Sequence, residues 1–81
     1  MKRIFMQSLK NEIKEQVKGE IYVRINDGTL IVYIIDGYVD FKITYKNIYR
    51  ETLFTRLSVK PLAKKIVKSY RNHILDTYFK K

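Results

Sequence analysis

The sequence has 81 residues, of which 17 are Lys or Arg and 8 are Asp or Glu, so its formal net charge is +9. This length fits one small domain over residues 1–81. The absence of cysteine excludes disulfides and cysteine-ligated zinc, and the longest apolar run, Leu30 to Ile35, is far shorter than the about 20 residues of a membrane-spanning helix. We therefore expect a cytoplasmic protein with no cofactor, metal or membrane contact.

The basic residues are concentrated in the second half of the chain. Residues 1–45 hold seven basic and six acidic residues, whereas residues 46–81 hold ten basic residues and two acidic ones, Glu51 and Asp76. This asymmetry is typical of a protein that contacts nucleic acid or another acidic surface. The many Lys, Ile, Tyr, Asn and Phe residues have AT-rich codons, which indicates an AT-rich genome such as that of a low-GC bacterium or of its phages and plasmids. We expect a gene carried by a phage or mobile element.

The first element predicted is an amphipathic helix over residues 3–18. Phe5, Leu9, Ile13 and Val17 recur every four residues, which places them on one face of a helix. Gly19 follows, as glycine often does after the end of a helix.

Residues 20–45 alternate between apolar and polar residues and predict three antiparallel strands. The strands are Glu20–Asn26, Thr29–Asp36 and Tyr38–Tyr45. Asp27-Gly28 and Asp36-Gly37 separate them, and Asp-Gly favours a two-residue type I′ hairpin turn. The first turn predicts the pairs Ile25–Leu30, Val23–Val32 and Ile21–Ile34, and the second predicts Ile34–Val39, Val32–Phe41 and Leu30–Ile43. Both turns place Leu30, Val32 and Ile34 on one apolar face.

The opposite face of this sheet is more apolar than a solvated face usually is. We expect it to be covered by residues 46–58, by a second copy of the chain or by a partner. Its tyrosines, beside two basic residues, are alternatively suited to stacking unpaired bases. The candidate residues for an interface or for base stacking are Tyr22, Arg24, Ile31, Tyr33, Ile35, Tyr38 and Lys42.

The last segment predicts a second amphipathic helix. Ser58 is a suitable N-cap, and Pro61 then lies in the first turn, where its missing N–H costs little. One arc of the helix holds Val59, Leu62, Ala63, Ile66, Val67, Tyr70, Ile74 and Tyr78. Residues 46–58 fit either a short helix or an ordered loop. The predicted fold is thus α+β, a two-layer α-β-β-β-α arrangement in which two helices pack on one face of a three-stranded antiparallel meander.

No pattern in the sequence predicts catalysis. The only histidine is His73, no serine has a recognisable base in a motif, and Asp27 and Asp36 lie in turns at opposite ends of one strand. The glycines are isolated, which excludes a glycine-rich phosphate loop. We expect a protein that is not an enzyme and has no catalytic or metal-binding residue.

The basic side of the last helix carries the main functional prediction. No acidic residue occurs between residues 52 and 75, although solvated helix faces usually mix both signs. Lysine and arginine at this density can contact several phosphates. The candidate nucleic-acid-binding residues are Lys60, Lys64, Lys65, Lys68, Arg71 and Arg56.

The order of elements is similar to that of a double-stranded-RNA-binding domain. Lys60, Ala63, Lys64 and Lys65 in the sequence KPLAKK resemble the lysine-rich start of the last helix in that family. The resemblance implies phosphate contacts from this helix. It is confined to element order and this motif, because the first hairpin loop lacks the Gly-Pro-x-His type sequence of the family.

These observations predict a small basic accessory protein that binds nucleic acid non-specifically, led by phosphate contacts. The alternative is a protein interaction module or inhibitor, which uses the apolar outer face of the sheet to bind an acidic protein or a second copy as a homodimer.

Overall fold

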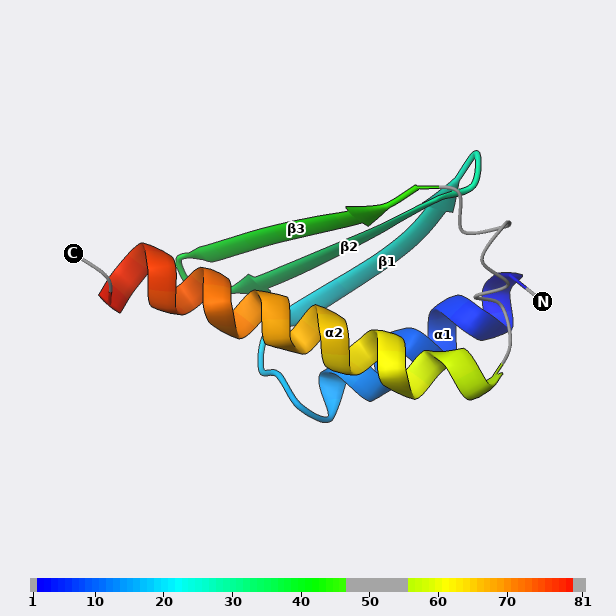
Figure 1. The fold of residues 1–81 in the computed structure, drawn as a ribbon, viewed down its shortest axis with the longest axis horizontal. Coiled ribbons are helices and arrows are strands. Elements are labelled where there is room, and N and C mark those ends of the chain that lie inside the picture. The colour runs from blue at the N-terminus through cyan, green and yellow to red at the C-terminus, as the bar shows by residue number, and fades with distance from the viewer. Residues whose placement is uncertain (1, 47–55, 80–81) are drawn as a thin grey trace.

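The computed structural model describes residues 2–46 and 56–79 and has the predicted order of elements (Figure 1). The elements are α1 (Lys2–Lys14), β1 (Glu20–Asn26), β2 (Thr29–Asp36), β3 (Val39–Tyr45), α2 (Arg56–Ile74) and a π-helical segment η1 (Leu75–Phe79). The three strands form one antiparallel sheet in the order β1-β2-β3. The predicted α+β fold is therefore confirmed.

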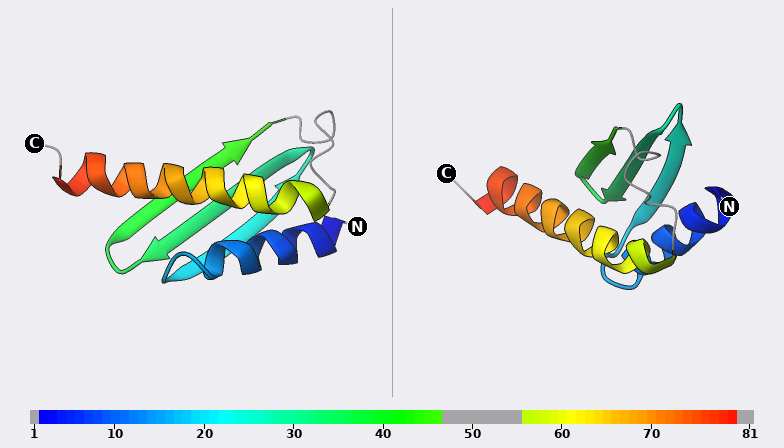
Figure 2. Two further views of the ribbon diagram at one scale, coloured as in Figure 1. Left: turned by 60° about the horizontal axis from the view of Figure 1, so that its bottom comes forward. Right: turned by 45° about the vertical axis from the view of Figure 1, so that its right-hand side comes forward.

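Both helices lie on the same face of the sheet and run side by side in the same direction (Figure 2). α1 packs against β1 and against α2, and α2 also contacts β3. No helix or strand within residues 2–46 and 56–79 covers the other face of the sheet. We call this uncovered side the outer sheet face.

The first hairpin has the predicted register. Ile25 pairs with Leu30, Val23 with Val32 and Ile21 with Ile34. Asp27 has a φ of 50° and Gly28 a φ of 75°, as a type I′ turn requires at its two central positions.

The second hairpin differs from the prediction by two residues. Val39 pairs with Asp36, so the loop consists of Gly37 and Tyr38 instead of Asp36 and Gly37. Gly37 has a φ of 64° whereas Tyr38 does not have a positive φ, which is the pattern of a type II′ turn with glycine first. The pairs that replace the predicted ones are Ile34–Phe41, Val32–Ile43 and Leu30–Tyr45. Because the shift is even, every side chain stays on its predicted face.

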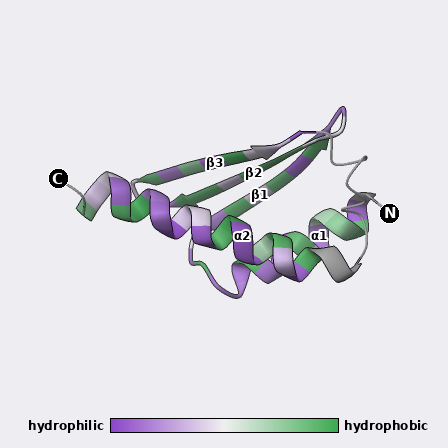
Figure 3. Cartoon of the chain, in the orientation of Figure 1, coloured by the Kyte–Doolittle hydropathy of each residue, from purple (hydrophilic) through white to green (hydrophobic). Residues whose placement is uncertain are grey.

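The core lies between the helices and the inward face of the sheet. Apolar residues alternate with polar ones along both helices, as the hydropathy colouring shows (Figure 3). The buried core residues are Phe5, Leu9, Ile13, Ile21, Leu30, Val32, Ile34, Val59, Leu62, Ala63, Ile66, Val67 and Tyr70. The predicted apolar stripe of α1 and most of that of α2 are thus in the core.

α1 ends at Lys14, earlier than the predicted end at residue 18. The Gln16 N–H donates to the Ile13 carbonyl at 3.0 Å, a tight three-residue step, and the Val17 N–H donates to the same carbonyl at 3.0 Å. The chain leaves the helix in this turn to reach β1, while Val17 still packs against the core.

α2 begins at Arg56, so the prediction that Ser58 caps its N-terminus is wrong. The helix has about one more turn than expected before Pro61, which therefore lies inside it. Proline has no N–H to donate to the carbonyl four residues earlier, here that of Leu57. The prediction of a start at Ser58 depends on the preference of proline for the first turn of a helix. The alternatives for residues 46–58 fall mostly on residues 47–55, outside the described part of the chain.

The apolar arc of α2 ends before Tyr78, which was predicted to belong to it. Ile74 is half-buried and Tyr78 is 47% exposed. The π-helical segment η1 changes the angular spacing of its residues after Ile74, and this end of the helix extends beyond the strands (Figure 1). The Tyr78 hydroxyl donates instead to the backbone carbonyl of Tyr38 at 3.3 Å.

Replacing Gly19 by alanine is expected to destabilise the fold by at least about 2 kcal/mol. Gly19 has a φ of 107°, and a Cβ atom there would lie 2.4 Å from the backbone carbonyl oxygen of Ile35. Gly37→Ala is the matched control, because Gly37 also has a positive φ but a Cβ there would have no neighbour within 4 Å. Urea unfolding measures both variants, and equal losses of stability would contradict this explanation.

Candidate nucleic-acid interface

Five basic side chains of α2 form one exposed surface, which we call the basic surface. At about 100° per residue they fall within an arc of about 140°, opposite the residues that α2 buries in the core. The residues of the basic surface are Lys60, Lys64, Lys65, Lys68 and Arg71, and all are exposed. The packing of the other side of the helix therefore determines that these side chains point outward.

The basic surface has dimensions that suit a nucleic-acid backbone. Lys60 and Arg71 are separated by eleven residues, which correspond to about 16 Å along a helix. Each strand of a duplex carries one phosphate per about 3.4 Å of helix axis, so a protein helix lying along that axis would span about five of them. Lysine ammonium groups and the arginine guanidinium donate several hydrogen bonds each to such oxygens.

The charges of the basic surface are not compensated within α2. The helix contains no Asp or Glu between Arg56 and Ile74. Among residues 2–46 and 56–79, no ion pair engages the five side chains of the basic surface. They are thus available to an external anion.

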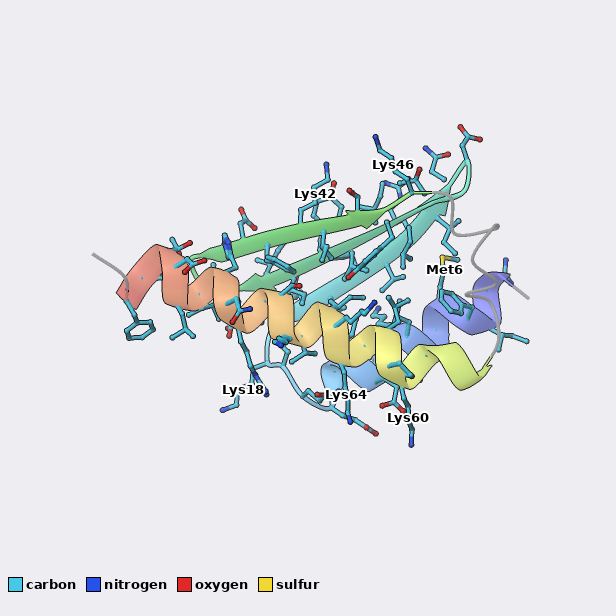
Figure 4. The ribbon with its side chains drawn as sticks, viewed as in Figure 1. Met6, Lys18, Lys42, Lys46, Lys60 and Lys64 are labelled. Atoms are coloured by element: carbon cyan, nitrogen blue, oxygen red, sulfur yellow. The ribbon has the colours of Figure 1, made fainter. Side chains whose placement is uncertain are left out.

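Figure 4 shows how the lysines divide between the two sides of the molecule. Lys60 and Lys64 extend from the helical side, whereas Lys42 and Lys46 extend from the side of the sheet. Lys18, in the connection after α1, extends toward the same side as Lys60 and Lys64. The sequence pattern does not single out Lys18 for this site, because only the packing of α1 beside α2 brings it to this side.

One predicted residue of the site is only partly described. Arg56 is the first residue of α2, and its side chain lies outside the described part of the structure. The other five predicted nucleic-acid-binding residues are brought together on the basic surface.

The outer sheet face contains the second predicted set of residues. Cross-strand pairing places Tyr22 opposite Tyr33, and Tyr33 opposite Lys42. The Lys42 Nζ lies 5.7 Å from the centre of the Tyr33 ring, within the range of a cation–π contact. The Tyr22 hydroxyl donates to Glu20 Oε2 at 2.6 Å. Lys42 therefore lies against one of the three tyrosine rings predicted for base stacking, that of Tyr33.

Exposure varies among the residues of the outer sheet face. Tyr22 is 48% and Ile35 36% exposed, whereas Ile31 and Tyr33 are half-buried among their neighbours on the sheet. Tyr38 is fully exposed, but it lies in the second turn and not in a strand as predicted. The expected cover by residues 46–58 falls largely outside the described residues, so the covering of this face stays a prediction.

His73 has a packing role. It is half-buried, and its ring centre lies 5.3 Å from that of Phe41, which also makes an edge contact with Tyr70 at 5.6 Å. Burial, followed by the negative charge of Asp36, raises the pKa of Tyr70.

In the described part of the chain, no three His, Asp or Glu side chains gather as metal ligands. None of the helices described there has the length and hydrophobicity of a membrane-spanning segment.

Comparisons with known proteins find no family model, no curated relative and no solved structure that matches this chain. The resemblance to double-stranded-RNA-binding domains thus rests on element order and the KPLAKK motif alone.

The Tyr22 phenol provides a test of the outer sheet face as the structure describes it. Its hydrogen bond to Glu20 and the charge of that carboxylate raise the pKa of Tyr22 above its ordinary value. Glu20→Gln is expected to lower this pKa toward the ordinary value, because the negative charge that opposes phenolate formation is removed.

An alkaline absorbance titration measures this change. Subtracting the titration of a Tyr22→Phe counterpart separates the signal of Tyr22 from that of the other six tyrosines of the chain. A difference curve that does not move in Glu20→Gln would contradict the contact.

Proposed function

We propose that this protein is a non-enzymatic nucleic-acid-binding protein that contacts phosphates through the basic surface of α2. The observation that carries the proposal is the alignment of five exposed basic side chains along a helix without an acidic residue. Contacts of this kind depend on the charge of the backbone and not on base identity, so we expect little sequence specificity.

The charge of the outer sheet face favours α2 as the nucleic-acid-binding element. The strand positions of that face carry two acids, Glu20 and Asp40, and two bases, Arg24 and Lys42. Lys46, just after β3, extends from the same side, so these five residues carry a net charge of +1. A nearly balanced face attracts a polyanion less than the basic surface does, whose five charges have no acidic partner in α2. Non-specific nucleic-acid binding through α2 therefore agrees better with the distribution of charge than binding through the sheet.

The proposal predicts strongly salt-dependent binding that depends on the basic surface. If the protein makes about five phosphate contacts, raising the salt concentration from 50 to 200 mM is expected to reduce its affinity for duplex DNA by about 10²- to 10³-fold. Lys64→Glu, Lys65→Glu and Lys68→Glu together are expected to weaken binding at low salt at least about 100-fold and to reduce the salt dependence by more than half. Fluorescence anisotropy with labelled duplex and single-stranded DNA and RNA of about 12 nucleotides, longer than the reach of one helix, measures these effects.

A matched control separates a local effect from a change of net charge. Arg24→Glu, Lys42→Glu and Lys46→Glu together alter the charge by the same amount on the other side of the molecule, where all three residues are exposed. This variant is expected to retain most of the affinity of the wild type for the short probes. Equal losses in the two variants, or no binding by the wild type at low salt, would refute the proposal.

A further inference from the structure

We infer that the outer sheet face binds a second copy of this chain, face to face and with the strands of the two copies antiparallel. The inference concerns a surface that the proposed function does not use. It rests on two features of this face, an apolar centre and charges separated along the strands. It also rests on how a two-fold axis pairs these charges between two copies.

The centre of the outer sheet face is apolar, and its flanks are polar. Ile31, Tyr33 and Ile35 point outward from β2, the central strand. The charged residues of the face lie on the two flanking strands. An apolar centre with a polar rim is the common anatomy of a protein interface.

The charges of this face are separated along the strand direction. Cross-strand pairing defines three successive rows across the sheet: Glu20–Ile35–Asp40, Tyr22–Tyr33–Lys42 and Arg24–Ile31–Thr44. The first row carries both acids, and the other two carry the two bases. One end of the face is therefore negative, and the centre and the other end are positive.

This separation makes the face complementary to itself in only one of two symmetric arrangements. A two-fold axis in the plane of the interface and perpendicular to the strands reverses the strand direction. Placed between the first two rows, this axis puts Asp40 of each copy over Lys42 of the other, and Glu20 over Tyr22. An axis parallel to the strands would instead place the acidic row over the acidic row. The antiparallel arrangement is therefore the one that pairs opposite charges.

The same features argue against nucleic acid as the occupant. The strand positions of the face are balanced in charge, and Lys42 lies over the ring of Tyr33, the central one of the tyrosines predicted to stack on a base. A second copy supplies both the apolar surface and the reversed charge pattern that the face requires.

The size of the face predicts a weak dimer. Three strands of about seven residues cover about 14 by 23 Å, which is an area of about 320 Å². Stable complexes usually bury about 800 Å² per partner. We therefore expect dimerisation at micromolar to submillimolar concentrations of protein.

A charge exchange within one chain tests the arrangement by sedimentation equilibrium. Asp40→Lys and Lys42→Asp each create like charges across the two-fold axis, and each is expected to weaken the dimer at least about fivefold. The double variant D40K/K42D restores opposite charges in the antiparallel dimer, and it is expected to return to within about twofold of the wild-type affinity. Both side chains are exposed, and circular dichroism checks that the fold is retained.

Two further variants fix the location of the interface. Tyr33→Asp is expected to abolish the dimer, whereas the Lys64→Glu, Lys65→Glu, Lys68→Glu triple variant is expected to dimerise like the wild type. A wild-type protein that stays monomeric, a dimer that Tyr33→Asp leaves intact, or a double variant as weak as the single ones would overturn the inference. No nucleic acid is present in these measurements, so their outcome is independent of the proposed function.

Discussion

The burial of the inward face of β2 is the constraint on which the rest of this structure depends. Leu30, Val32 and Ile34 are each 0% exposed. A three-stranded sheet can remove such a strip from water only if other elements cover it. α1 and α2 provide that cover from one side, and both helices expose their polar faces as a result. The same packing leaves the outer sheet face without a cover among the described elements.

The turns of the two hairpins show which part of this arrangement follows from local sequence. Asp27-Gly28 forms the turn expected of it, whereas Asp36-Gly37 does not, because Gly37 takes the first central position of a type II′ turn. The resulting shift of two residues left the predicted buried face intact, since side chains alternate with a period of two. It did change the neighbours across the outer sheet face, where Lys42 and not Asp40 lies opposite Tyr33.

The ends of the helices were less predictable than their faces. Pro61 and Gly19 are local signals, but α1 ends where the chain must turn toward β1, and α2 begins before the predicted cap at Ser58. The exposed bases of α2 were predictable, because the apolar arc of an amphipathic helix determines the opposite side. The placement of Lys18 near that side was not, since it depends on how two helices distant in sequence pack together.

The two surfaces proposed to be functional lie on opposite layers of the molecule, and this separation has consequences for binding. A dimer through the outer sheet face would have four layers, with its sheets inside and its helices outside. The two basic surfaces would then face away from each other and could not contact the same short stretch of nucleic acid. Dimerisation would therefore leave the affinity for short probes unchanged. On long nucleic acids, the second basic surface would raise the avidity by binding a distant segment or a second molecule.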